Sequence, residues 1–261
     1  MERLVESAPL ELQGFNNLTK TLNFNLYDFA AARSVNERDS YVAYVNENFN
    51  RQKISAILRN IAEMIAARVL AISDQDYRPW GASSMLLLSD SIVADTPHPP
   101  QPANVPVPVS VAAHLDKSHI CAHTYPDFKG EVCSFRLDIS ISTCGKILPL
   151  RALNYMFGAF ESDVVIIDYL VRGFTRSNDG KQVYLDHDLD SIQDYLEPKI
   201  LDDYACYDHN NTKANVWQTK LIRKRMNEPS YFRDEVDLNT AGAQRTLSLI
   251  KAEMEGVFHN R

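Results

Sequence analysis

The sequence lacks any run of about 18 apolar residues, so it predicts no transmembrane helix. Its first residues, Met1-Glu2-Arg3-Leu4-Val5-Glu6, also lack the basic segment followed by an apolar segment that is typical of a secretion signal. We therefore expect a cytoplasmic protein that does not associate with a membrane. Cysteine is scarce, and in that compartment the four residues are expected to be free thiols: Cys121, Cys133, Cys144 and Cys206.

Basic residues are in deficit, with 27 Lys and Arg against 34 Asp and Glu, which gives a formal net charge of −7. A general nucleic-acid-binding protein normally carries a basic patch or stripe, so nucleic acid is not an expected partner. The 261 residues, 45% hydrophobic and 23% charged, have the composition of an ordinary globular protein of one or two domains. We expect a single domain over residues 1–261.

Proline is concentrated in one stretch, because six of the 12 prolines lie between Pro97 and Pro108. Proline fixes φ and has no amide hydrogen, so residues 91–108 are expected to form neither a helix nor a central strand. An extended connector of this composition could join two domains. We interpret it instead as an insertion that loops out of one domain, because neither flank looks complete alone.

The first half of the chain has the pattern of several strands and one long helix, after an N-terminal arm of residues 1–20. Short apolar or alternating segments predict strands at residues 22–27, 69–73, 84–88, 109–113, 118–125 and 132–142. Apolar residues spaced three and four apart predict a helix over residues 37–67. Its apolar stripe consists of Ile54, Ile57, Leu58, Ile61, Met64 and Ile65.

The second half begins with a similar pattern and then becomes helical. Pro149 is well placed for the first turn of a helix that ends near Phe160, and strands are expected at residues 164–171 and 181–186. Residues 188–261 are expected to be a helical extension. The order of elements favours an α+β fold, with an antiparallel or mixed sheet and helices on one face. Two charged clusters are expected to be solvated surface: Asp186-His187-Asp188 and Asp202-Asp203.

Reactive side chains crowd together between His114 and Pro126, where three of the seven histidines lie within ten residues. Side chains two residues apart on a strand share a face, so His119, Cys121 and His123 are expected to point the same way. Imidazole and thiolate ligands suit zinc, with Cys144 or His114 as a fourth ligand. The pattern is nevertheless a weak signature, because zinc motifs usually pair their ligands through short loops or helical turns. A non-catalytic metal-binding module is therefore one hypothesis.

A second hypothesis starts from Ser118 in the same stretch. A serine hydroxyl can attack the carbonyl group that precedes it, which converts the amide into an ester. Elimination then cuts the chain and leaves dehydroalanine, which hydrolyses to a pyruvoyl group that forms a Schiff base with an amine and accepts electrons. The pattern alone does not decide this. Ser118 could be an ordinary polar residue, His123 a hydrogen-bonded core histidine, and Cys144 a small buried hydrophobe, as we expect for Cys121 and Cys133.

Several motifs in order share a resemblance to one known family. They are His114-Leu115-Asp116-Lys117-Ser118-His119-Ile120-Cys121, His123-Thr124-Tyr125-Pro126, Ser142-Thr143-Cys144-Gly145, Gly14-Phe15-Asn16-Asn17-Leu18-Thr19-Lys20, Ala152-Leu153-Asn154-Tyr155 and Val171-Arg172-Gly173-Phe174-Thr175-Arg176. With these motifs, residues 13–200 resemble the bacterial S-adenosylmethionine decarboxylase proenzymes of the longer, enterobacterial type. The resemblance weakens in the proline-rich insertion and in the C-terminal tail.

The resemblance implies a role for individual positions. Members of the family cleave themselves before a serine, which matches Ser118, so the bond to Lys117 would break to give a β chain of residues 1–117 and an α chain of residues 118–261. Ser118 would become the pyruvoyl group that forms the Schiff base. His123 matches the histidine that assists processing, and Cys144 matches the thiol that protonates the substrate carbon. A thiol suits this task because its pKa can be tuned towards neutrality.

The resemblance also implies the reaction and the assembly. The expected reaction is decarboxylation of S-adenosylmethionine to S-adenosylmethioninamine for spermidine biosynthesis, with magnesium as a further requirement at a position that the sequence does not indicate. The expected fold is a two-layer α/β sandwich, mostly antiparallel, whose sheets pack together across a dimer in a homo-oligomer of αβ units, a dimer or a tetramer. Aromatic rings could bind the sulfonium and the adenine, and the candidates are Phe15, Phe24, Tyr27, Tyr77 and Trp80.

Two other functions stay open at this point. A pyruvoyl decarboxylase of another amino acid, such as arginine or ornithine, could use the same self-processing stretch with a different pocket. The metal-binding module is the other alternative. The first would be distinguished by its substrate, and the second by a chain that is never cut at Ser118.

Overall fold

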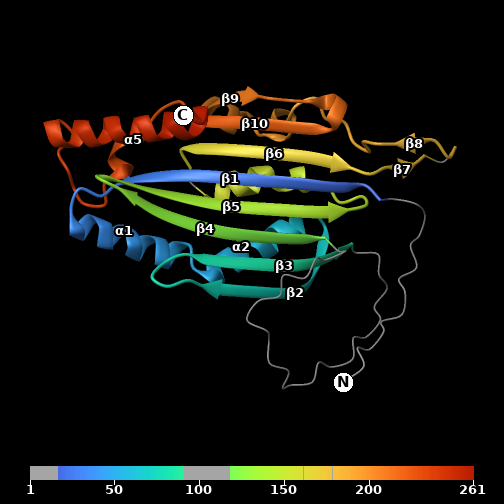
Figure 1. Cartoon of the computed structure of the whole chain (residues 1–261), viewed down its shortest axis with the longest axis horizontal. Helices are drawn as coiled ribbons and strands as arrows, with labels where there is room; N and C mark the ends of the chain where they lie inside the picture. Colours follow the sequence, from blue (N-terminus) through green and yellow to red (C-terminus); the bar gives the residue numbers. More distant parts are fainter. Residues whose placement is uncertain (1–16, 91–117, 161, 178) are drawn as a thin grey trace, which may run out of the picture.

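The computed structural model describes residues 17–90, 118–160, 162–177 and 179–261, and their main feature is one eight-stranded sheet (Figure 1). Each neighbouring pair of strands runs antiparallel, which confirms the α+β prediction with its mostly antiparallel sheet. Across the sheet the strands are β2 (Ala67–Asp76), β3 (Ala82–Asp90), β4 (His119–Lys129), β5 (Val132–Cys144), β1 (Thr19–Ala31), β6 (Val164–Arg172), β10 (Val216–Arg223) and β9 (Tyr204–Asp208).

The central strand β1 shows how the sequence separates the two faces of this sheet. Leu22, Phe24 and Leu26 are at most 1% exposed, whereas the residues between them, Asn23 and Asn25, are half-buried. Successive side chains on a strand point to opposite faces, so the alternation gives β1 one apolar and one polar face. Strand β5 alternates in the same way and pairs with β1 from Thr19 to Ala31.

The apolar face is covered by helices, as Figure 1 shows for α2 and α3 behind the sheet. Helix α2 (Arg51–Met64) contacts β2, β3 and β4, and its buried stripe includes Ile54, Leu58 and Ile61. These three residues belong to the stripe predicted from the sequence, while Met64 from the same stripe is exposed. Residues from β1, β3, β4, β5 and β6 complete one continuous hydrophobic core with this helix.

The helix predicted over residues 37–67 is in fact two helices, α1 (Val35–Asn48) and α2. The break has a local cause, because the side chain of Asn50 accepts a hydrogen bond from the backbone N–H of Lys53 and caps the start of α2. Ser34 caps α1 in the same way. Glycine and proline are the residues that most strongly indicate the end of a helix, and neither is present at the break. The sequence pattern therefore did not predict it.

The helix predicted from Pro149 begins as expected and contributes to the same core. Pro149 occupies the first turn of a 3₁₀ helix, η1 (Pro149–Ala152), which continues into α3 (Leu153–Ala159). A proline fits there because the first N–H groups of a helix have no partner within it. Of the strand expected at residues 181–186, β8 (Gln182–Val183) pairs with β7 (Thr175–Arg176) in a small hairpin.

The prediction that residues 188–261 are a helical extension is wrong for two segments. Strands β9 and β10 lie in this region and extend the main sheet beyond β6. The pattern of β10 is weak in the sequence, because the polar Thr219 lies on its apolar face between Trp217 and Leu221 and is fully buried. The remaining helical elements are η2 (Ile192–Tyr195), α4 (Pro198–Asp203), η3 (Thr212–Ala214), η4 (Glu228–Tyr231) and α5 (Ala241–His259).

Helix α5 covers one end of the sheet face that lies opposite α2. Its buried residues Leu247 and Ile250 form a second hydrophobic cluster with Phe29 and Val132, at the end of β1 and the start of β5. The rest of this face, towards the start of β1, carries half-buried polar side chains and is not covered by any other described helix. No helix among the described residues is long and apolar enough to cross a membrane.

Some sequence-based expectations lie outside the described residues. They are the proline-rich insertion 91–108, the strand 109–113, Lys117 and nearly all of the N-terminal arm. Ser118 is described, and it stands immediately before β4. Because β4 and β5 are antiparallel, Ser118 comes to the same end of the sheet as Cys144, the last residue of β5, far from α5.

Candidate active site

Ser118 is held between two strands, although it lies outside them. It is 4% exposed, and its carbonyl oxygen accepts a hydrogen bond of 2.7 Å from the backbone N–H of Leu88 on β3. Its hydroxyl oxygen Oγ accepts a 3.1 Å hydrogen bond from the backbone N–H of Cys144. The structure thus brings together Ser118 and Cys144, two of the residues that the sequence marked as candidates, although 26 positions separate them in the chain.

The turn that carries Cys144 is fixed by β1. Gly145 has a φ of 69°, a left-handed conformation that glycine adopts without steric cost. Its backbone N–H donates to the carbonyl oxygen of Leu18 at 3.1 Å, and its own carbonyl oxygen accepts from the Lys20 ammonium at 2.8 Å. Both polar backbone groups of Gly145 therefore have a partner at the start of β1, which restricts the position of Cys144 beside it.

Lys20 is a site residue that the sequence analysis missed. It is 1% exposed, and its Nζ lies 2.8 Å from Oδ2 of Asp186, whose side chain is 20% exposed. Asp186 is exposed, as expected for surface, but its carboxylate also neutralises a buried ammonium, which was not expected. A signal was present in the sequence, since Lys20 occupies an inward position in the alternation that continues with Leu22 and Phe24.

His123 does not come close to Ser118 within one chain. It lies in the middle of β4, five residues after Ser118, which corresponds to about 16 Å along an extended strand. Its side chain is half-buried on the polar face, and in the register of the sheet it stands opposite Asp138 of β5 and Ser83 of β3. The structure therefore assembles Ser118 and Cys144 but leaves His123 apart from them.

The metal hypothesis is tested by the same strand. His119, Cys121 and His123 alternate with buried residues, so they share the polar face as predicted. Even so, the described part of the chain holds no group of three or more His, Cys, Asp or Glu side chains placed to bind a metal ion. Burial raises the pKa of the Cys121 thiol, and the nearby charge of Asp138 raises it further, so this thiol is no ready thiolate ligand.

All four cysteines are free thiols, as predicted. Cys133 is fully buried, and burial raises the pKa of its thiol to about 12. It therefore behaves as the small hydrophobe that we expected.

The aromatic candidates for substrate binding are not equivalent. Phe24 is fully buried and packs edge-on against Phe157 of α3, so it belongs to the core and cannot contact a substrate. Trp80 packs edge-on against Phe128, and Tyr77 is 40% exposed. Phe15 lies outside the described residues.

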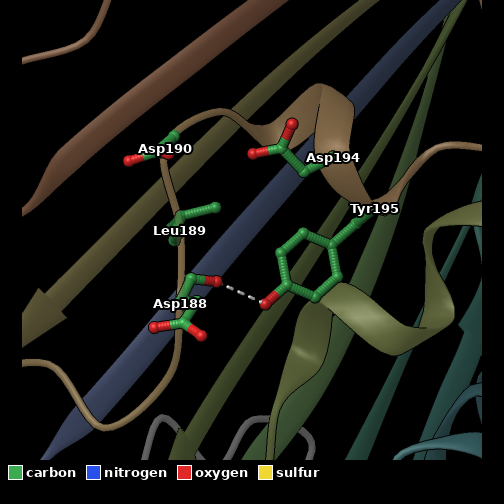
Figure 2. A pocket seen from close by; sticks show the side chains of 5 residues that line it. All are labelled: Asp188, Leu189, Asp190, Asp194 and Tyr195. Carbon is green, nitrogen blue, oxygen red and sulfur yellow. Dashed lines mark hydrogen bonds between the residues drawn. The ribbon is translucent and has the colours of Figure 1, made fainter.

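A surface pocket follows the segment that carries Asp186. It is lined by Asp188, Leu189, Asp190, Asp194 and Tyr195 (Figure 2). The Tyr195 hydroxyl donates to the carbonyl oxygen of Asp188 at 2.8 Å, and the Asp194 carboxylate accepts from the backbone N–H of Ser191. The side chains of Tyr195 and Asp194 thus stabilise the loop that follows Asp186.

Comparisons with known proteins agree with the motifs. The chain is 42% identical over 259 residues to an S-adenosylmethionine decarboxylase proenzyme from Hahella chejuensis, covering 98% of both chains. It is 43% identical over 258 residues to one from Photorhabdus laumondii, with 97% of both covered, and 43% identical over 263 residues to one from Stenotrophomonas maltophilia, with 99% and 98% covered. No family model matches the sequence.

Two solved structures match this chain more distantly. One is an adenosylmethionine decarboxylase from Aquifex aeolicus, with 15% identity, a TM-score of 0.35, and coverage of 67% of this chain and 98% of that one. The other is a Trypanosoma brucei AdoMetDC monomer, with 10% identity, a TM-score of 0.34, and coverage of 79% and 66%. Identity above 40% over nearly the whole chain decides the matter independently of these structures: the protein belongs to the S-adenosylmethionine decarboxylase proenzyme family.

Proposed function

We propose that this protein cuts itself between Lys117 and Ser118, converts Ser118 into a pyruvoyl group, and then decarboxylates S-adenosylmethionine to the aminopropyl donor of spermidine biosynthesis. The observation that supports this most is the hydrogen bond from the Cys144 N–H to the buried Ser118 hydroxyl. It joins the residue that would be processed to the residue that would donate a proton. The name of the relatives, proenzymes, agrees with a processing step.

The cleavage step uses the Ser118 hydroxyl as the nucleophile. Oγ attacks the carbonyl carbon of Lys117, the C–N bond breaks, and the resulting ester leaves the Ser118 nitrogen as a free amine. The Cys144 N–H would stabilise negative charge on Oγ as its proton departs, and a hydrogen bond to a charged group contributes about 1.5–3 kcal/mol. Loss of the α-proton of Ser118 then expels the Lys117 carboxylate and leaves dehydroalanine. Water hydrolyses the dehydroalanine to the pyruvoyl group, and its nitrogen leaves as ammonia.

The pyruvoyl group supplies a carbonyl that binds the amine of the substrate and accepts the electron pair released with carbon dioxide. This chain must then return a proton to the substrate carbon. Cys144 is the proposed donor, because its own backbone N–H contacts Ser118 and so places the residue beside the reacting atoms. The buried position of Ser118 also limits access of water to these atoms.

His123 requires a second copy of the chain if it acts in processing. Its position about five strand residues from Ser118 prevents direct contact within one chain. It does point to the polar face of the sheet, most of which carries half-buried polar side chains away from α5. We propose a homo-oligomer in which these faces pack together, so that His123 of each copy approaches the partner's cleavage site.

The resemblance also implies magnesium. No three potential ligands are grouped among the described residues, so no residue is assigned to the ion and no step is derived through it. We place the enzyme in the cytoplasm, which agrees with four cysteines that are all unpaired.

The substrate assignment is tested by measuring carbon dioxide release from carboxyl-labelled S-adenosylmethionine, arginine and ornithine in parallel. We expect release from S-adenosylmethionine and none above background from the two basic amino acids. Release from arginine or ornithine alone would show a pyruvoyl enzyme with a different pocket.

A further inference from the structure

We propose that Lys20 is a positioning residue of this decarboxylase, whose ammonium group, oriented by Asp186, fixes the Cys144-Gly145 turn against Ser118. The inference rests on the proposed roles of Ser118 and Cys144. It adds a partly buried ion pair that touches neither the substrate nor the reacting atoms and acts through the backbone of Gly145.

The environment of Lys20 argues against a purely structural role. Position 20 lies on the apolar face of β1, next to Leu22 and in register with Thr143 of β5 and Val171 of β6. An ammonium at such a position is unfavourable unless it is fully paired, and an apolar side chain would fill the space without that cost. The ammonium makes contacts that an apolar residue cannot make, so its role depends on what these contacts hold.

What the ammonium does is visible in its two contacts. Nζ donates to the carbonyl oxygen of Gly145 and to Oδ2 of Asp186, each at 2.8 Å. The first bond holds the turn directly after Cys144. The second bond connects the turn to a loop 166 positions away from Lys20 in the sequence, beyond the β7–β8 hairpin.

Asp186 is itself held in place, so the ion pair has a defined geometry. Its Oδ1 lies 2.9 Å from Nδ1 of His187, and Nε2 of His187 lies 3.2 Å from the hydroxyl of Tyr169 on β6. Burial raises the pKa of Tyr169, so the phenol keeps its proton and can donate it to Nε2. Burial opposes ionisation of Asp186, but hydrogen bonds from Lys20 and His187 outweigh it and lower the pKa of the carboxyl, which stays charged.

The loop beyond Asp186 is anchored as well. The hydrogen bond from Tyr195 to the carbonyl oxygen of Asp188, seen in Figure 2, closes the loop two residues later. Asp186 is thus held by its own loop, and Lys20 connects it to the Cys144-Gly145 turn. The turn is the part of the site whose position depends on this connection. Displacement of a reacting group by about 1 Å can slow a reaction about 100-fold. Loss of the Lys20 contacts is therefore expected to change the reaction rate measurably.

The experiment compares three variants of the full chain. Lys20→Met removes the ammonium with little change in length, and Asp186→Asn removes its partner while leaving Lys20 in place. Lys220→Met is the matched control, because Lys220 is also a buried lysine, 8% exposed, that donates to a backbone carbonyl, that of Phe258 at the α5 end of the sheet. For each variant we would measure thermal unfolding, the rate of self-cleavage, and kcat and KM for S-adenosylmethionine.

Lys20→Met and Asp186→Asn are expected to slow self-cleavage and to lower kcat about 10- to 100-fold with little change in KM, because the turn and not the substrate is displaced. Lys220→Met is expected to lose stability but to keep both rates. The proposal is overturned if the two site variants keep both rates at the level of the Lys220 control, or if kcat falls only in proportion to the folded fraction.

One further readout does not depend on the reaction. The rate at which iodoacetamide alkylates Cys144, followed by peptide mass spectrometry with Cys121 as the internal reference, reports on the placement of the turn. We expect Lys20→Met and Asp186→Asn to change the ratio of the two rates, and an unchanged ratio would contradict the role of Lys20. If the unaltered protein neither cuts itself nor releases carbon dioxide, the proposed function fails, whereas this ratio still tests the positioning.

Discussion

The backbone N–H of Cys144 donates to the hydroxyl oxygen of Ser118 at 3.1 Å. One residue thereby contributes two separate groups to the site, an amide for the cleavage of the chain and a thiol for the turnover of the substrate. The amide is independent of the side chain, so the two functions can be separated by mutation.

Cys144→Ala is therefore expected to cut itself at close to the normal rate while its decarboxylase kcat falls about 100-fold or more, the range typical of losing a general acid. Cys121→Ala is the matched control, because Cys121 is another half-buried cysteine on the same sheet face and has no proposed role. Gel analysis of the cut chains and a carbon dioxide assay measure the two steps. Equal loss of cleavage and turnover would show that the thiol and the amide do not act separately.

His123→Asn is expected to leave the chain mostly uncut, because the proposed proton carrier is lost. If His123 acts across an interface between copies, co-expression with a Ser118→Ala chain should restore cleavage of the His123→Asn chain. The Ser118→Ala chain itself stays uncut and supplies only its histidine. A mass tag on one chain identifies which copy is cleaved, and normal cleavage of His123→Asn expressed alone would remove this residue from the mechanism.

The fold was predictable where apolar and polar residues alternate regularly along a strand or where a proline marks the start of a helix. Alternation at Leu22, Phe24 and Leu26 correctly predicted β1, and Pro149 correctly marked the start of a helix. Sequence patterns did not detect the break between α1 and α2, because Asn50 acts through a local side-chain hydrogen bond. They also missed β10, in which the polar Thr219 occupies a fully buried position on the apolar face.

The site was predictable only in part, for a similar reason. The motifs identified Ser118 and Cys144, but their contact depends on the pairing of β4 with β5, which no local pattern states. The ion pair of Asp186 could not be predicted, because its partner Lys20 is remote in the sequence. The separation of His123 from Ser118 follows from strand geometry, and it is visible only once Ser118 is known to precede an extended strand.

A pH dependence of stability is expected from the carboxyl pair near the end of β1. Burial raises the pKa of Asp28 well above 3.8, and the negative charge of Asp163 raises it further. Asp163 accepts hydrogen bonds from the Tyr231 hydroxyl at 2.7 Å and the Phe29 N–H at 3.2 Å, which favour its charged form over that of Asp28. Asp28 therefore keeps its proton in the folded protein at pH values where the unfolded chain has lost it.

The sign follows from this difference in bound protons. The free energy of unfolding falls as pH rises from about 4 towards the folded-state pKa of Asp28, by up to about 1.4 kcal/mol per pH unit. Asp28→Asn should remove this loss, so that thermal unfolding at pH 8 occurs at a higher temperature than in the unaltered protein, while the two proteins converge near pH 4. Samples must be compared in the same processing state. Parallel curves across this range would contradict a protonated Asp28.

Intact mass spectrometry of the freshly purified protein shows whether the chain breaks before Ser118. We expect two species, residues 1–117 and residues 118–261, the second carrying a pyruvoyl group in place of its N-terminal serine and therefore blocked to Edman degradation. The Ser118→Ala variant should give one uncut chain of about 29.6 kDa. A single uncut chain from the unaltered protein, with no species that begins at residue 118, would contradict self-cleavage and the pyruvoyl mechanism.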